Sequence, residues 1–153
     1  FIRRESLPAK KAAQRAIFHV ENELETLVRE EGQSAIVLCD RGTLDALAYW
    51  PNSEESFWRE VRTTRDKELA RYSAVIHLRT PSVSNGYNHT NPMRVETVQE
   101  AQAIDQRIVK AWEGHPKRFF VEASEEFFDK ARKTIDLIAA EIPKCCRAGV
   151  LKN

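Results

Sequence analysis

The chain has 153 residues, of which 42% are hydrophobic and 31% are charged, and its formal net charge is +1. This length fits one domain with a real core, and the balanced charge gives no bulk electrostatic case for nucleic acid or a membrane surface as a partner. The longest apolar stretches, near 35–39 and 74–76, fall well short of the roughly 20 apolar residues that a membrane span needs.

The first predicted element is a long helix. It begins near Pro8, a residue suited to the first helical turn, and ends at Gly32. Apolar residues recur along it at steps of three and four, which is the spacing of a single helical face. The members of this face are Ala13, Ala16, Ile17, Val20, Leu24, Leu27 and Val28.

A buried strand is predicted next, over residues 34–40. The segment is short, apolar without alternation and partly β-branched, as expected for a strand covered on both faces of a parallel sheet. Cys39 within it is interpreted as a small buried hydrophobic residue. The three cysteines form neither a disulfide framework nor a zinc spacing, so we expect a reducing, cytoplasmic location.

Two short helices are predicted after this strand, one capped by Thr43 and the other opened by residues 51–53. A second buried strand is expected over 72–78, followed by a loop over 79–92 that is rich in Pro, Gly, Ser and Asn. Further along the chain we expect a helix from Thr97 to Gly114, a strand over 118–121 and a last helix capped by Ser124.

This alternation of helices and strands predicts an α/β fold of three layers, α/β/α, with a mainly parallel sheet. We expect the domain to occupy residues 1–143 and residues 144–153 to form a flexible tail. The first strand of such a sheet is not evident in the chain, so the fold is expected to be incomplete at its N-terminus.

Ligands of open α/β sheets gather beyond the carboxyl ends of the strands. The strongest candidate at such a position is the pair Asp40 and Arg41. A carboxylate there is suited to Mg²⁺, which prefers oxygen ligands, and a neighbouring guanidinium matches phosphate oxygens. The alternative is that Asp40 caps the following helix and Arg41 is a solvated surface charge.

Two further candidate positions follow the later strands. The loop from Arg79 to Arg94 also holds Tyr87, and its length is typical of a lid whose arginine meets charge on a transferring phosphoryl group. The alternative for it is a solvated basic loop. The third position, after the strand over 118–121, is the run of Glu122, Ala123 and Ser124.

The segment from Ile36 to Pro51, which reads IVLCDRGTLDALAYWP, resembles the "vlcDRG-x-x-D-x-x-AYwp" segment of the NadR-like AAA domain family. Similar segments include residues 72–80, the lid and helix from Arg94 to Pro116, and the ending from Glu122 to Lys130. In that ending Ala123 stands where the family has Asn. The resemblance covers nearly the whole chain up to about Ile142, and the ordered set of segments is its specific feature.

These relatives are P-loop ATPases or GTPases related to nucleoside and nucleotide kinases. The resemblance implies a Mg-dependent, ATP- or GTP-binding domain with an unidentified small-molecule acceptor. It implies catalytic roles for Asp40, Arg41 and Arg94, with Asp40 also serving the metal. It also implies substrate contacts from Asp45, Tyr87 and Arg79 and nucleotide contacts from Glu122, Ala123 and Ser124.

The family also has a first strand and a G-x-x-x-x-G-K-[ST] loop, whose backbone N–H groups and lysine cradle phosphates. No such run occurs in this sequence. We expect the gene product to begin upstream of Phe1, or the chain to be a degenerate relative, and we expect the chain as given to bind nucleoside triphosphates poorly. Two other functions stay open, a non-catalytic nucleotide- or protein-binding module and a small-molecule kinase.

Overall fold

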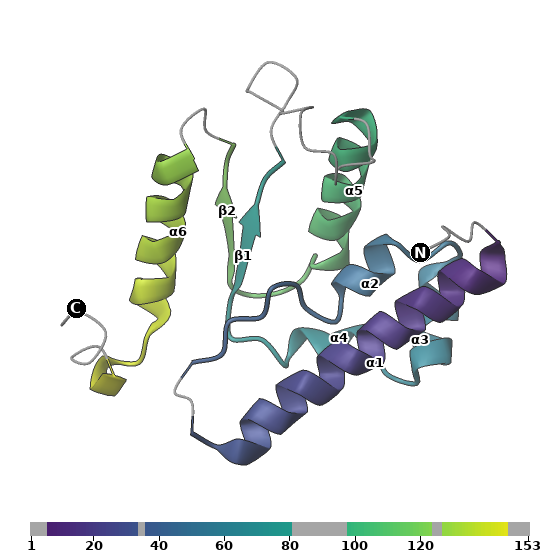
Figure 1. Cartoon of the computed structure of the whole chain (residues 1–153), viewed down its shortest axis with the longest axis horizontal. Coiled ribbons are helices and arrows are strands. Elements are labelled where there is room, and N and C mark those ends of the chain that lie inside the picture. Colours follow the sequence, from purple (N-terminus) through teal and green to yellow (C-terminus); the bar gives the residue numbers. More distant parts are fainter. Residues whose placement is uncertain (1–5, 34–35, 81–97, 124–126, 147–153) are drawn as a thin grey trace. The chain divides into compact units, whose positions relative to one another are not determined.

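The computed structural model describes residues 6–33, 36–80, 98–123 and 127–146. The chain divides into two compact units, each of which is described by itself. The first consists of residues 1–72 with 110–114, and the second of residues 73–109 with 115–153. The elements are labelled in Figure 1. Within the described residues, no helix is both long enough and apolar enough to cross a lipid bilayer.

Helix α1 (Leu7–Glu31) is the longest helix of the first unit and confirms the sequence prediction. The side chain of Ser6 accepts a hydrogen bond from the backbone N–H of Ala9 at its start. At its end Gly32 adopts the left-handed conformation, with φ of 61°, and donates its N–H to the carbonyl of Val28. Both ends of the helix are therefore fixed by local sequence.

Three short helices complete the first unit: α2 (Asp45–Ala48), α3 (Glu54–Val61) and α4 (Arg65–Leu69). Ser53 caps α3 and Thr64 caps α4, each through a side-chain oxygen that accepts a backbone N–H. The core of the unit joins α2 and α3 to α1, and its buried members are Phe18, Ala46, Trp50, Phe57 and Val61.

Aromatic rings dominate this core. The ring of Phe57 makes edge-to-face contacts with Phe18, at a centroid distance of 5.8 Å, and with Trp50, at 5.3 Å. The indole N–H of Trp50 donates to Ser56 Oγ at 2.8 Å, so this buried polar group is satisfied. Trp50 and Trp112 are both buried, so both are packing residues.

The second unit contains a parallel pair of strands, β1 (Val75–Leu78) and β2 (Arg118–Val121), in which Val75 pairs with Arg118. Helix α5 (Val98–Ala111) is linked to β1 by a bond between His77 and Asp105, and α6 (Phe127–Glu141) packs against β2 (Figure 1). A short 3₁₀ helix, η2 (Lys144–Cys146), follows α6. Within this unit strands and helices alternate as predicted, while three layers around a larger sheet remain a prediction.

The predicted strand over 34–40 is wrong for its described part, because residues 36–40 have neither helical nor strand structure. Val37 and Leu38 are exposed, by 48% and 68%, and Cys39 is exposed as well instead of buried. A strand exists only when its N–H and C=O groups pair with a neighbour. Within the described residues the two strands pair with each other alone, so the apolar sequence of 36–39 is present without the pairing.

The apolar face of α1 is also more exposed than expected for a helix that packs its apolar side against a core. Ile17, Val20, Leu24 and Leu27 on that face are between 44% and 58% exposed. The opposite side of the helix holds Phe18 in the core and attaches through polar groups, such as Lys11 with Glu60 at 2.8 Å. A sequence pattern shows that a helix has an apolar face but not which side its neighbours occupy.

Candidate functional site

The turn Asp40–Thr43 occupies an unusual backbone conformation. Arg41 has a φ of 84°, in the left-handed region that non-glycine residues rarely adopt. A Cβ on the next residue, Gly42, would lie 2.7 Å from the Trp112 ring and 3.0 Å from the Tyr72 ring. Only glycine therefore lets the turn pass this close to the two rings.

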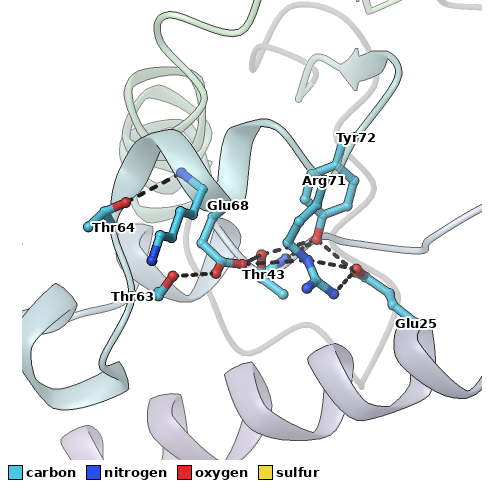
Figure 2. A network of polar contacts seen from close by, with 8 residues as sticks. Glu25, Thr43, Thr63, Thr64, Glu68, Arg71 and Tyr72 are labelled. Carbon is cyan, nitrogen blue, oxygen red and sulfur yellow. Dashed lines mark hydrogen bonds and ion pairs between the residues drawn. The ribbon is translucent and has the colours of Figure 1, made fainter.

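A buried polar network holds the turn from its inner side (Figure 2). Thr43 donates its backbone N–H to the Tyr72 hydroxyl at 2.7 Å and its own hydroxyl to Glu68 at 2.8 Å. Tyr72 in turn donates to Glu25 of α1 at 2.7 Å, and Arg71 pairs with the same glutamate at 2.7 Å. The turn is thus tied to both α1 and α4.

The network also affects the protonation of its members. Burial, together with the hydrogen bond to Glu25, raises the pKa of Tyr72 far above its ordinary value, even though the bonds to Thr43 act in the opposite direction. Tyr72 therefore remains a neutral hydroxyl that both donates and accepts. A neutral hydroxyl that makes two hydrogen bonds in this way helps to keep the turn in one conformation.

A pocket of about 230 Å³ lies between α1 and the segment from Arg41 to Tyr49 in the first unit. Its volume is below the usual range for a drug-sized ligand and fits a sugar-sized group. The pocket is lined by Gln14, Ile17, Glu21, Arg41, Asp45, Ala46 and Tyr49.

Two carboxylates and one guanidinium face this pocket. Asp45 is buried, and one of its oxygens accepts a hydrogen bond from the Trp112 indole at 2.5 Å. Its other oxygen lies 3.8 Å from the Arg41 guanidinium, which also donates to the Tyr49 hydroxyl at 3.2 Å. The rotations of Arg41 and Asp45 are therefore constrained from both sides.

Glu21 is the unusual member of the site. Its Oε2 atom is buried and has no hydrogen-bond partner within the part of the chain that the structure describes. Burial first, and then repulsion by Asp45 and Glu25, raise the pKa of Glu21 to about 7, against a smaller opposing effect of Arg41. A carboxyl group with a pKa near 7 can accept a proton from a ligand and return it at neutral pH.

The structure brings together two of the predicted site residues, Arg41 and Asp45, in this pocket. Asp40 is exposed and immediately precedes Arg41. No three His, Cys, Asp or Glu side chains of the described ranges are arranged to hold a metal ion. The metal role of Asp40 stays a prediction.

Other predicted site residues lie in the second unit, at the carboxyl ends of the parallel strands. Arg79 follows β1 and Glu122 follows β2, with Leu78 and Val121 paired between them. Arg79 forms an ion pair with Asp105 at 3.1 Å. Charged residues therefore lie at the strand ends where the rule predicts ligands, and their role as a ligand site stays a prediction.

Ala123 is partly buried next to Glu122. Tyr87, Arg94 and Ser124 lie outside the described residues, so the lid and part of the nucleotide-contact predictions have no structural counterpart here.

The family model described as "AAA domain" matches residues 2–130. The chain belongs to the AAA domain family, within the P-loop NTPase superfamily. No curated protein and no solved structure matches the chain. This membership supports the α/β fold expected from the sequence.

Sequence reasoning missed Glu21 as a member of the site of this AAA domain. On the helical pattern it is one of several glutamates in the second half of α1, and nothing in its neighbours distinguishes it from Glu23. The distinguishing fact is tertiary, because Asp45 and Arg41 approach it from another part of the chain. One usable signal existed, since Glu21 lies four residues after Ile17 and seven after Gln14, on one helical face.

Proposed function

We propose that this AAA domain chain carries the acceptor site of a NadR-like, kinase-like phosphotransfer domain that depends on Mg²⁺ and on ATP or GTP. The observation that supports this most is the convergence of Glu21, Arg41 and Asp45 on one small pocket. Family membership supports nucleotide-dependent chemistry in general, and the pocket supports a separate, smaller ligand beside the nucleotide. A cytoplasmic location is part of the same proposal.

The acceptor whose sugar fits this pocket is a neutral, hydroxyl-bearing molecule such as a nucleoside. Two carboxylates against one guanidinium disfavour a phosphate dianion inside the pocket, whereas carboxylates accept hydrogen bonds from sugar hydroxyls. Glu21 would take the proton of the attacking hydroxyl. Its pKa of about 7 keeps a large part of it unprotonated at neutral pH.

Arg41 has a different role. Its side chain is about half exposed, with 51% of its surface open to solvent, so the guanidinium can reach a phosphoryl group outside the pocket while Asp45 restrains it. Asp40 would bind Mg²⁺ together with phosphate and water, and the ion would neutralise phosphate charge. Arg79, Tyr87 and Arg94 are proposed to act from the lid, and Glu122, Ala123 and Ser124 at the nucleotide.

The acceptor proposal is tested by isothermal titration of the chain with adenosine and guanosine, and separately with Mg-ATP. We expect a nucleoside to bind and Mg-ATP to bind poorly, because the sequence contains no phosphate-cradling loop. Asp45→Asn should weaken nucleoside binding about tenfold, since it replaces a charged acceptor.

Arg62→Ala is the matched control, because Arg62 is also an exposed arginine with positive φ, 57°, but lies outside the pocket. Its nucleoside affinity should equal that of the parent. The acceptor role is wrong if no nucleoside binds, or if Asp45→Asn and Arg62→Ala have equal effects. Micromolar Mg-ATP binding without nucleoside binding would favour the alternative of a nucleotide-binding module.

A further inference from the structure

The exposed apolar face of α1 forms a regular stripe. Ala13, Ile17, Val20, Leu24 and Leu27 follow one another at steps of four, three, four and three, which is the spacing of a coiled-coil seam. The four larger members are 44–58% exposed. The helix is attached to its own unit mainly by its other side, where Phe18 enters the core and Glu25 joins the network behind the turn, and Ile17 alone of the stripe also lines the pocket beside α1.

The stripe is bounded by opposite charges. Continuing the same heptad spacing places Lys10 at its N-terminal end and Glu31 at its C-terminal end, both exposed. They are separated by three heptads, so they lie along one side of the helix about 31 Å apart. The helix as a whole has the same polarity, with Lys10, Lys11 and Arg15 in its first half and mostly glutamates in its second.

We propose that a second copy of this chain packs its α1 antiparallel against this stripe and that the chain forms a homodimer through it. An antiparallel pairing centred between Val20 and Glu21 sets Ile17 of each copy opposite Leu24 of the other. It also sets Lys10 opposite Glu31 at both ends of the pair. A parallel pairing would instead oppose Lys10 to Lys10 and Glu31 to Glu31, which is electrostatically unfavourable.

A second copy fits this surface for a symmetry reason. A two-fold interface must be complementary to itself, so each feature has to meet its opposite across the axis. A continuous apolar stripe with a cation at one end and an anion at the other satisfies this condition when the two helices run in opposite directions. Burying such a stripe removes apolar surface from water in both copies.

The test is sedimentation velocity of the intact chain over a range of concentrations. We expect a monomer–dimer equilibrium, and Leu24→Glu should raise the dimer Kd at least about tenfold, because each dimer would bury two unpaired carboxylates. Ile135→Glu is the matched control, since Ile135 is 63% exposed on α6 and receives the same change. Its Kd should equal that of the parent. Far-ultraviolet circular dichroism checks that both variants remain folded.

A charge exchange tests the direction of the pairing. Lys10→Glu alone should weaken the dimer by up to about tenfold, because it creates two like-charged pairs. Adding Glu31→Lys to the same chain should restore the parent Kd. A parallel dimer would respond to neither change.

A monomer at all concentrations would overturn the proposal, and it is the outcome expected if another part of a longer protein covers the stripe. A dimer that survives Leu24→Glu would overturn it too, since the interface would then lie elsewhere. Weakening by Lys10→Glu without restoration by Glu31→Lys would contradict the antiparallel arrangement.

Discussion

Each of the two units gathers charged side chains around one carboxylate, but the hydrogen bonding of that carboxylate differs between the units. In the second unit Asp105 is bonded to His77 at 3.1 Å, to Arg79 at 3.1 Å and to the backbone N–H of Thr80 at 3.2 Å. In the first unit Glu21 has a buried oxygen without a partner among the described residues. A carboxylate whose oxygens all have hydrogen-bond partners stabilises the fold. A carboxylate that faces a pocket with an oxygen lacking such a partner is available to a ligand.

The same contrast appears in the neighbouring lysine of the second unit. Lys130 donates to the carbonyl of Arg79 at 2.7 Å. Burial lowers its pKa, while Asp105 and Glu122 act to raise it. The Lys130 ammonium group, too, already has a hydrogen-bond partner within the protein. The strand-end cluster, which the sequence rule selected as a ligand position, therefore has less capacity left for a ligand than the pocket beside α1.

Among variants of the two units, Asp105→Ala is expected to change the free energy of unfolding most. Removing this carboxylate leaves His77 and Arg79 without their buried partner, so the free energy of unfolding should fall by about 3 kcal/mol. Urea denaturation followed by circular dichroism measures it. The control is Glu122→Ala, an exposed carboxylate of the same unit, which should change stability by no more than about 0.5 kcal/mol. Equal effects of the two variants would show that Asp105 is not a structural centre.

Glu21→Gln, in contrast, should raise the free energy of unfolding, and only at higher pH. The folded chain holds the Glu21 proton more tightly than the unfolded chain, with a pKa raised from 4.5 to about 7. Ionisation therefore costs stability progressively as the pH rises between these values, and the full cost remains above them. At about pH 8 the variant should be more stable than the parent by about 1 kcal/mol, after a discount for solvent screening.

Below about pH 4 the Gln variant and the parent should have equal stability, because Glu21 is then protonated in both states. Glu23→Gln, an exposed neighbour on the same helix, is the control and should show no such pH dependence. A stability difference between parent and Glu21→Gln that stays constant from acid to alkaline pH would mean that Glu21 is solvated like an ordinary surface residue.

The smallest effect concerns the backbone of the turn. Glycine adopts positive φ without cost, so Arg62→Gly should stabilise the chain by about 0.5–1 kcal/mol. Arg41→Gly should relieve the same backbone strain but removes the contacts to Tyr49 and Asp45. It should therefore stabilise the chain less than Arg62→Gly does. Thermal unfolding of both variants measures the difference. If the two gains are equal, the contacts of Arg41 contribute nothing and the pocket is less ordered than described.

Much of the fold was predictable because its signals are local. The start of α1 near Pro8, its end at Gly32 and the strand over 118–121 depend on residues close together in the sequence. Arg41 and Asp45 were also identified, because they lie within the segment from Ile36 to Pro51 that resembles the family. The strand over 34–40 was wrong, and Glu21 was missed, because pairing and burial depend on residues far away in the chain.

The proposed site depends most on Glu21, whose carboxyl group faces the pocket and has a raised pKa. A carbon-13 NMR titration of the glutamate side-chain carboxyls tests it most directly, with Glu21→Gln used to assign the resonance. We expect a midpoint at about pH 7, and a shift of that midpoint when adenosine or guanosine saturates the pocket. A midpoint near the ordinary glutamate value of about 4.3, unchanged by either nucleoside, would contradict it.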